Sequence, residues 1–213
     1  MNIKSILLYF VFALSLSCTQ ERISDQSKHI FYLHGRIVEI HGKEAFSEQF
    51  GKYEFDSIVS RLSIDGYTMH NEVRSTYVDV NHYASYISNQ IDSLISIGTK
   101  PNNISVVGAS KGGIIAANIS HLNNNPINYV LLAANNEYQE QHNDWIFHGR
   151  VLGIYDTSDN IAGRSYSYWI NRKYKTSSFE QLAIDTKLGH GFLYRPLDAW
   201  MRPTNNWILN RGN

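Results

Sequence analysis

Cysteine is almost absent from this chain of 213 residues, since Cys18 is the only one. An intramolecular disulfide is therefore excluded, and a metal site would have to form without a pair of thiolates. The nine histidines include no H-x-x-x-H pair, which would place two imidazoles on one helix face. We accordingly predict no metal and no cofactor.

A net charge is also absent, because 19 lysines and arginines balance 19 acidic residues. A neutral chain provides no field that would hold a polyanion, so nucleic-acid binding is not expected. No internal repeat is visible, and the polar segment 123–126 is an ordinary loop rather than a linker. The length fits one compact domain with a substantial core.

The apolar run over residues 6–16 is too short to span a bilayer comfortably. It follows Lys4 and leads to small residues before Cys18, the layout of a secretory signal over residues 1–17. The segment resembles a bacterial lipoprotein signal, in which the cysteine becomes the first mature residue and carries the lipid. It departs from that pattern at Ser15, where an aliphatic residue is preferred.

The lipoprotein resemblance implies a domain held on a membrane surface in the bacterial envelope by acyl chains on Cys18. Residues 18–28 are polar and lack periodicity, as expected of a tether, and residues 29–213 form the predicted folded domain. The alternative is a plain signal peptide with an incidental cysteine, which would give a secreted or periplasmic protein.

Short apolar runs alternate with longer amphipathic stretches over the predicted domain. The predicted strands cover residues 29–35, 67–74, 104–110, 128–135, 150–156 and 179–185. The predicted helices cover residues 54–66, 81–98, 111–122 and 196–209. Because strands that alternate with helices need crossover connections, the fold class is α/β, with a mostly parallel sheet of about six strands and helices on both faces.

The sequence VVGASKGG over residues 106–113 contains the pattern Gly108-x-Ser110-x-Gly112 at a predicted junction of strand and helix. A nucleophile elbow requires such a junction, where a sharp turn exposes the serine hydroxyl at the start of a helix. Ser110 is therefore the predicted nucleophile. The alternative is a serine that merely caps the helix after a core strand.

A serine hydroxyl needs a base to take its proton and an acid to orient that base. His190 follows the last predicted strand in a loop flanked by glycines, which suits a base that must reach the elbow. Two acids follow the strand 150–156, and we favour Asp159 because it lies within the loop. Asp156 is the alternative triad acid, although it can instead stabilise the turn through the backbone.

An acyl-transfer site also needs backbone N–H groups that stabilise the oxyanion. Lys111, directly after the nucleophile, is predicted to supply one of them. The loop after the first strand contains His34, Gly35 and Arg36. Because Gly35 permits a close approach of the backbone, the N–H of Arg36 is the second predicted donor.

These four elements, in this order, resemble the α/β-hydrolase family. They are the loop with His34 and Gly35, the elbow GASKG, the segment VLGIYDTSDNIAG and the histidine of GHGF. The resemblance covers residues 29–209 and implies an esterase-type triad of Ser110, Asp159 and His190. The chain departs from the family by starting near its third strand and by leaving only residues 137–149 for a lid.

The substrate-binding prediction includes His34, Gly35 and Arg74, which lie at the ends of two strands that are neighbours in this family. Arg36 or Arg74 would recognise a carboxylate or another polar group, with Glu39 to orient one of them. The alternative is that these are ordinary surface arginines in loops.

The resemblance implies a small serine hydrolase without a large lid, which cleaves a carboxylic ester or thioester through an acyl-enzyme. A serine peptidase that acts on short peptides is the enzymatic alternative. A binding protein of the envelope that keeps the fold without the chemistry is the alternative from another functional class.

Overall fold

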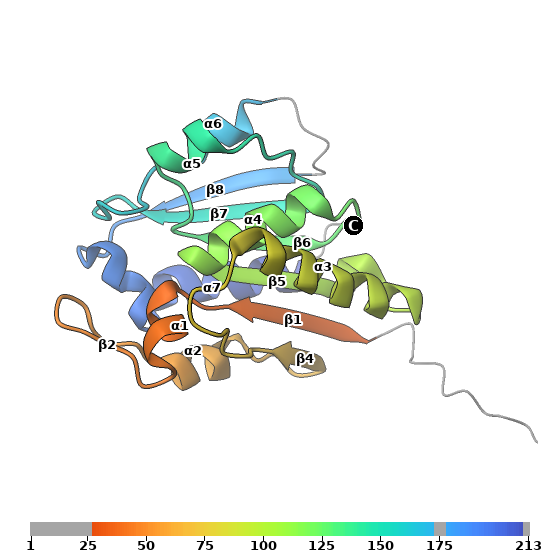
Figure 1. The fold of residues 1–213 in the computed structure, drawn as a ribbon, viewed down its shortest axis with the longest axis horizontal. Helices are drawn as coiled ribbons and strands as arrows, with labels where there is room; N and C mark the ends of the chain where they lie inside the picture. The colour runs from red at the N-terminus through yellow and green to blue at the C-terminus, as the bar shows by residue number, and fades with distance from the viewer. Residues whose placement is uncertain (1–26, 173–177, 211–213) are drawn as a thin grey trace, which may run out of the picture.

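The computed structural model describes residues 27–172 and 178–210 (Figure 1). The predicted signal segment 1–17, Cys18 and the tether up to residue 26 lie outside the described residues. None of the helices in the described part combines the length and apolar composition that crossing a membrane requires.

A six-stranded sheet forms the centre of the fold, in the order β4-β1-β5-β6-β7-β8, and every neighbouring pair is parallel. The strands are β1 (Lys28–Leu33), β4 (Tyr67–His70), β5 (Ile104–Ala109), β6 (Asn128–Leu132), β7 (Arg150–Asp156) and β8 (Ser178–Ile184). The predicted parallel sheet of about six strands is thus confirmed. The carboxyl ends of its strands all lie at one edge, where ligands bind in α/β proteins.

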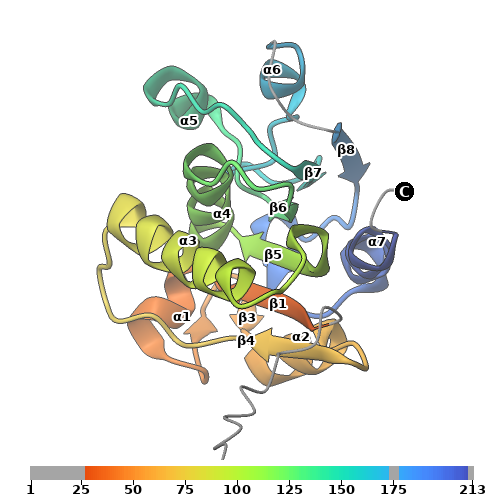
Figure 2. The same ribbon diagram turned by 90° about the vertical axis from the view of Figure 1, so that its right-hand side faces the viewer.

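Helices cover both faces of the sheet because its central strands are apolar on both sides (Figure 2). Along β1, Ile30 and Tyr32 pack toward α2 (Phe55–Leu62) and α7 (Asp198–Leu209). The alternating residues Phe31 and Leu33 pack toward α3 (Val80–Ser96) and α4 (Lys111–Leu122). All four predicted helices form, and α4 has the predicted bounds.

Several short elements were not predicted, since they contain too few residues for a periodic pattern. They are the helices α1 (Arg36–His41), α5 (Glu137–His142) and α6 (Ser167–Ile170), the 3₁₀ helices η1 (Pro101–Asn103) and η2 (Gly189–Tyr194), and the antiparallel pair β2 (Phe46–Ser47) and β3 (Gly51–Lys52). Two of them, α1 and η2, directly follow β1 and β8 at the carboxyl edge of the sheet. The predicted strands 29–35 and 67–74 were too long, because the chain leaves the sheet after Leu33 and His70.

The connection between β6 and β7 is short, as predicted. Residues 133–149, all of which the structure describes, contain α5 as their only helix. No large lid is therefore inserted at this point of the sheet.

Candidate active site

Ser110 occupies a sharp turn between β5 and α4, at the carboxyl edge of the sheet. Its backbone has φ 52° and ψ −119°, in the left-handed half of conformational space that favours glycine. A side chain persists in such a conformation only where the surrounding structure imposes it. The turn is therefore one that this part of the fold enforces at the cost of local strain.

The glycines on either side of Ser110 allow the close packing that enforces the turn. A Cβ atom on Gly108 would lie 2.3 Å from the carbonyl oxygen of Gly112. A Cβ atom on Gly112 would lie 1.8 Å from the carbonyl oxygen of Leu33, at the end of β1. Both contacts involve backbone atoms, which cannot move aside as a flexible side chain would.

Gly112→Ala is expected to destabilise the protein by about 3 kcal/mol or more, because its methyl group would overlap the backbone at the end of β1. Gly35→Ala is the matched control, since a Cβ there would meet Ser110 Cβ at 3.6 Å, an ordinary contact. Gly35→Ala should change the stability by less than about 1 kcal/mol. Urea denaturation followed by circular dichroism measures both, and equal midpoints for the two variants would contradict the packing argument.

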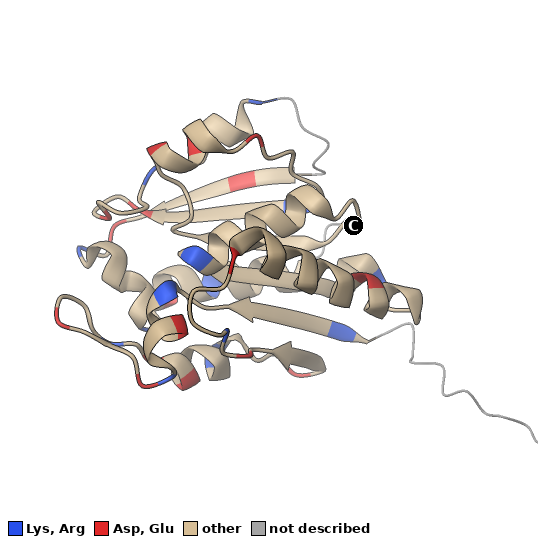
Figure 3. Cartoon of the chain, in the orientation of Figure 1, with Lys and Arg blue, Asp and Glu red and all other residues tan. Residues whose placement is uncertain are grey.

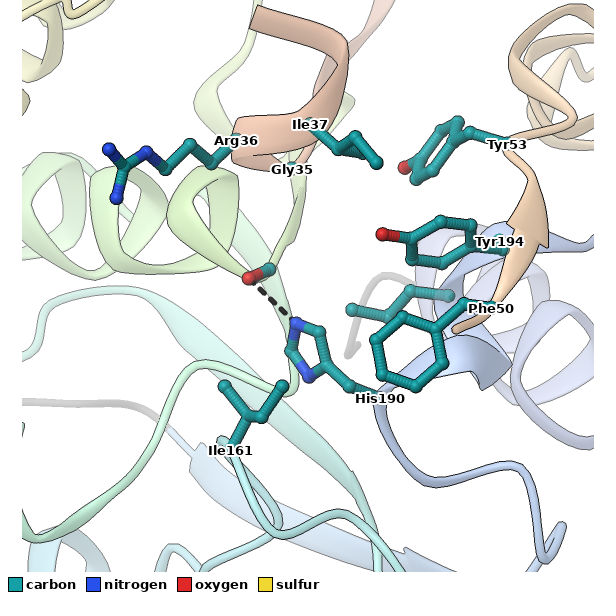
Figure 4. Close-up of a pocket in the computed structure, with 10 residues that line it drawn as sticks. Gly35, Arg36, Ile37, Phe50, Tyr53, Ile161, His190 and Tyr194 are labelled. Carbon is teal, nitrogen blue, oxygen red and sulfur yellow. Dashed lines mark hydrogen bonds between the residues drawn. The ribbon is translucent and has the colours of Figure 1, made fainter. Parts of the chain in front are cut away.

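His190 connects Ser110 to Asp159. Its Nε2 atom lies 2.9 Å from Ser110 Oγ, the hydrogen bond that Figure 4 marks with a dashed line. Its Nδ1 atom lies 2.7 Å from Asp159 Oδ2. His190 belongs to η2 rather than to an irregular loop, and its side chain is 9% exposed. Ser110 is the N-cap residue of α4 but makes no side-chain capping hydrogen bond, so the capping alternative does not describe its hydroxyl.

The two candidate acids occupy different environments. Asp159 accepts hydrogen bonds from His190 and from the backbone N–H groups of Ile161 and Ala162. Burial alone would raise the pKa of Asp159, but these hydrogen bonds and the neighbouring imidazole lower it below the usual value, so the carboxylate is ionised at neutral pH.

Asp156, by contrast, holds the end of β7 against the segment after β8. It accepts hydrogen bonds from the hydroxyl and backbone N–H groups of Ser158 and Thr186. Burial acts to raise the pKa of Asp156 as well, and the four donors lower it. The structure brings Asp159, and not Asp156, to the histidine.

The two predicted oxyanion donors lie on neighbouring segments. Arg36 and Lys111 are the first residues of α1 and α4, where a backbone N–H has no acceptor within its own helix. The parallel pairing of Leu33 with Gly108 brings the loop after β1 beside the elbow. The positive ends of two helices thus meet next to the hydroxyl of Ser110.

No family model and no curated protein matches the chain. Solved structures resemble it, among them an esterase of Pyrococcus furiosus, at 14% identity and a TM-score of 0.58 over 88% of this chain and 85% of its own. A lipase-esterase related protein from Clostridium acetobutylicum has 13% identity and a TM-score of 0.57 over 86% and 96%. The RedJ thioesterase of Streptomyces coelicolor has 9% identity and a TM-score of 0.54 over 84% and 85%. The chain has the α/β-hydrolase fold.

In this α/β-hydrolase fold a cavity of about 170 Å³ opens beside Ser110 and His190 (Figure 4). Its lining is mostly apolar and aromatic and consists of Gly35, Arg36, Ile37, Phe50, Tyr53, Ser110, Ile161, His190, Leu193 and Tyr194. Phe50 comes from the β2–β3 turn, and its ring centroid lies 6.4 Å from that of His190. The hydroxyl of Tyr53 lies 2.6 Å from that of Tyr32.

Most of this lining was not predicted from the sequence. Phe50 and Tyr53 belong to a segment without a periodic pattern: Phe50 lies between β2 and β3, which were both missed, and Tyr53 directly follows β3. Leu193 and Tyr194 follow His190 within three to four residues, and that proximity was the available signal. The described residues contain no group of three or more metal-ligating side chains.

Of the residues predicted to bind substrate, Gly35 and Arg36 line the cavity. His34 and Arg74 are buried behind it, with exposures of 0% and 3%. Arg74 donates to Glu39 and to the carbonyl oxygen of His34, so its guanidinium is used within the protein rather than offered to a ligand. Both residues follow strands at the predicted edge of the sheet, but their side chains are buried and bonded within the protein.

Proposed function

We propose that the protein is a serine hydrolase that cleaves a carboxylic ester or thioester through an acyl-enzyme. The observation that carries the proposal is the unbroken line of hydrogen bonds from Ser110 through His190 to Asp159, at 2.9 Å and 2.7 Å, beginning at a strained elbow. Solved esterases and thioesterases with the same fold add support.

The first half of the reaction forms the acyl-enzyme. Ser110 Oγ attacks the carbonyl carbon while His190 Nε2 takes the hydroxyl proton. Asp159 accepts from Nδ1–H, which keeps the ring in the tautomer whose Nε2 is free to act as a base, and stabilises the imidazolium that forms. The N–H groups of Arg36 and Lys111 donate to the oxyanion.

The tetrahedral intermediate that carries this oxyanion then collapses, and the bond from its carbon to the leaving oxygen or sulfur breaks. His190 Nε2 returns its proton to that leaving atom, which departs as an alcohol or thiol. In the second half, a water molecule attacks the acyl carbon while His190 Nε2 removes one of its protons, which forms a second tetrahedral intermediate. This intermediate collapses by breaking the bond to Ser110 Oγ, which takes the proton back from His190, and the carboxylic acid leaves.

The volume and the lining of the cavity support a substrate with a small acyl group. A volume of about 170 Å³ is close to that of a cavity that holds one benzene ring, so it suits a short acyl or small aromatic group. Ile37, Phe50 and Leu193 supply apolar contacts for such a group, and Gly35 lies beside the reacting carbonyl.

A substrate panel tests the proposal. The purified protein is assayed with p-nitrophenyl esters from acetyl to octanoyl, with acyl thioesters and with short peptide p-nitroanilides. We expect saturable hydrolysis of the short-chain esters or thioesters, with a burst of p-nitrophenol that equals the enzyme concentration where deacylation is slow. Hydrolysis of the peptides alone would indicate the peptidase, and no turnover on any substrate would indicate the binding protein.

We also propose that the protein is exported and held on a membrane surface through lipid on Cys18. Cys18→Ser is expected to move the protein from the membrane fraction of the producing bacterium to the soluble fraction, because acyl chains supply the affinity for the bilayer. Immunoblots of the separated fractions measure the shift. An unchanged distribution would favour the plain signal peptide.

A further inference from the structure

The direction of the Arg36 N–H is fixed by its own peptide group. A trans peptide is planar, so the N–H of Arg36 points opposite to the carbonyl group of Gly35. That carbonyl oxygen lies 2.9 Å from His34 Nδ1. Whatever holds the His34 ring in place therefore also sets the direction of the Arg36 N–H.

The His34 ring is itself held by Arg74. The backbone N–H of Arg74 donates to His34 Nε2 at 3.0 Å, which fixes the tautomer in which Nδ1 carries the proton and donates to Gly35. The Arg74 guanidinium donates to the carbonyl oxygen of His34. Burial, followed by the charge of Arg74, lowers the pKa of His34 to about 4, so the ring is neutral at neutral pH and Nε2 can accept.

Arg74 is linked in turn, through Glu39, to the side chain of Lys111, whose backbone N–H is the other predicted oxyanion donor. The Glu39 carboxylate is 1% exposed and accepts from Arg74 Nε at 3.4 Å and from Lys111 Nζ at 2.7 Å. Lys111 Nζ also donates to the carbonyl oxygen of Val78 at 2.7 Å. Figure 3 shows charged residues of both signs on α1 and a positive residue at the start of α4, the two helices that the pair of Glu39 and Lys111 joins.

We propose that the buried chain of His34, Arg74 and Glu39 positions the two oxyanion donors. It aims the N–H of Arg36 through the Gly35 peptide, and it ties α1 to the side chain of Lys111. These three residues do not line the cavity, so they are positioning residues that act through the backbone and through Lys111. The inference rests on the proposed acyl-transfer function. The charges of this chain are buried and paired, which makes the arrangement rigid and sensitive to the loss of any member.

Two variants test the positioning role. His34→Asn removes the ring that aims the Gly35 peptide, and Lys111→Met keeps the backbone N–H but removes the ammonium group. Each is expected to lower kcat by about 10- to 100-fold, since small errors in placement cost rates of this size, while KM changes by less than about threefold. Binding of a trifluoromethyl ketone, which forms a tetrahedral adduct, should weaken by the same factor as kcat/KM.

His29→Asn is the matched control, because His29 is a buried histidine on β1, the strand that His34 directly follows, and its Nδ1 is bonded to His70 instead of to the loop. It should retain the wild-type kcat. Circular dichroism checks the fold of each variant, and Lys111→Met, at a side chain 17% exposed, decides the question if His34→Asn does not fold.

An active wild type with unchanged kcat in the folded variants would overturn the positioning role. Equal losses in kcat and in ground-state binding would also overturn it, because they would indicate general damage. A folded wild type without turnover on any ester or thioester would instead overturn the proposed function.

Discussion

Ser110→Ala is expected to lower ester turnover by about 10⁶-fold, because it removes the atom that forms the acyl-enzyme. The variant should fold, since alanine has the same Cβ as serine and places the same strain on the turn. Its stability should remain within about 1 kcal/mol of the wild-type value. Steady-state rates at high enzyme concentration, compared with the rate in buffer, measure the loss.

Ser105→Ala is the control for this experiment. Ser105 is a buried serine on β5, the strand that leads to Ser110, near the end opposite to the elbow, and lies outside the cavity. Its variant should retain the wild-type rate. Turnover by Ser110→Ala within tenfold of the wild type would mean that another group attacks the substrate.

Asp159→Asn is expected to lower kcat by about 10⁴-fold. An asparagine amide can donate to His190 Nδ1, which favours the tautomer that carries its proton on Nε2 and can no longer take one from Ser110. The effect on KM should be small, because Asp159 is not among the residues that line the cavity. Steady-state kinetics on the best ester of the panel give both constants.

Asp156→Asn provides the matched comparison, since the two carboxylates lie in the same turn. It should cost about 2 kcal/mol of stability, because the amide nitrogen that replaces one carboxylate oxygen would face the donors of either Ser158 or Thr186. Its kcat should fall by less than about tenfold. A larger loss of kcat in Asp156→Asn than in Asp159→Asn would reverse the assignment of the acid.

The central strands were predictable because parallel strands buried on both faces are nearly continuous apolar runs, as residues 104–109 illustrate. The bounds of α4 were equally clear, since Ser110 and Asn123 flank a helical pattern. β4 was predicted too long. It is an edge strand, whose polar residues give no signal for the point at which it leaves the sheet.

The geometry around the elbow was less predictable, and Arg74 illustrates the reason. Its position after β4 correctly indicated the carboxyl edge of the sheet. Whether its guanidinium turns to the cavity or inward depends on Glu39, which belongs to a six-residue helix that has no periodic signature. The position of Phe50 in the cavity could not be predicted for the same reason, because strands of two residues on each side of a turn are too short to give a periodic sequence pattern.

Fluorophosphonate labelling of the wild-type protein, with the modified residue mapped by mass spectrometry, shows directly whether the hydroxyl of Ser110 is activated. A fluorophosphonate reacts with a serine only where a neighbouring base activates the hydroxyl. We expect label on Ser110, and no label in Ser110→Ala or His190→Ala. A folded wild type that stays unlabelled, or that carries its label on another residue, would contradict an activated nucleophile at the elbow.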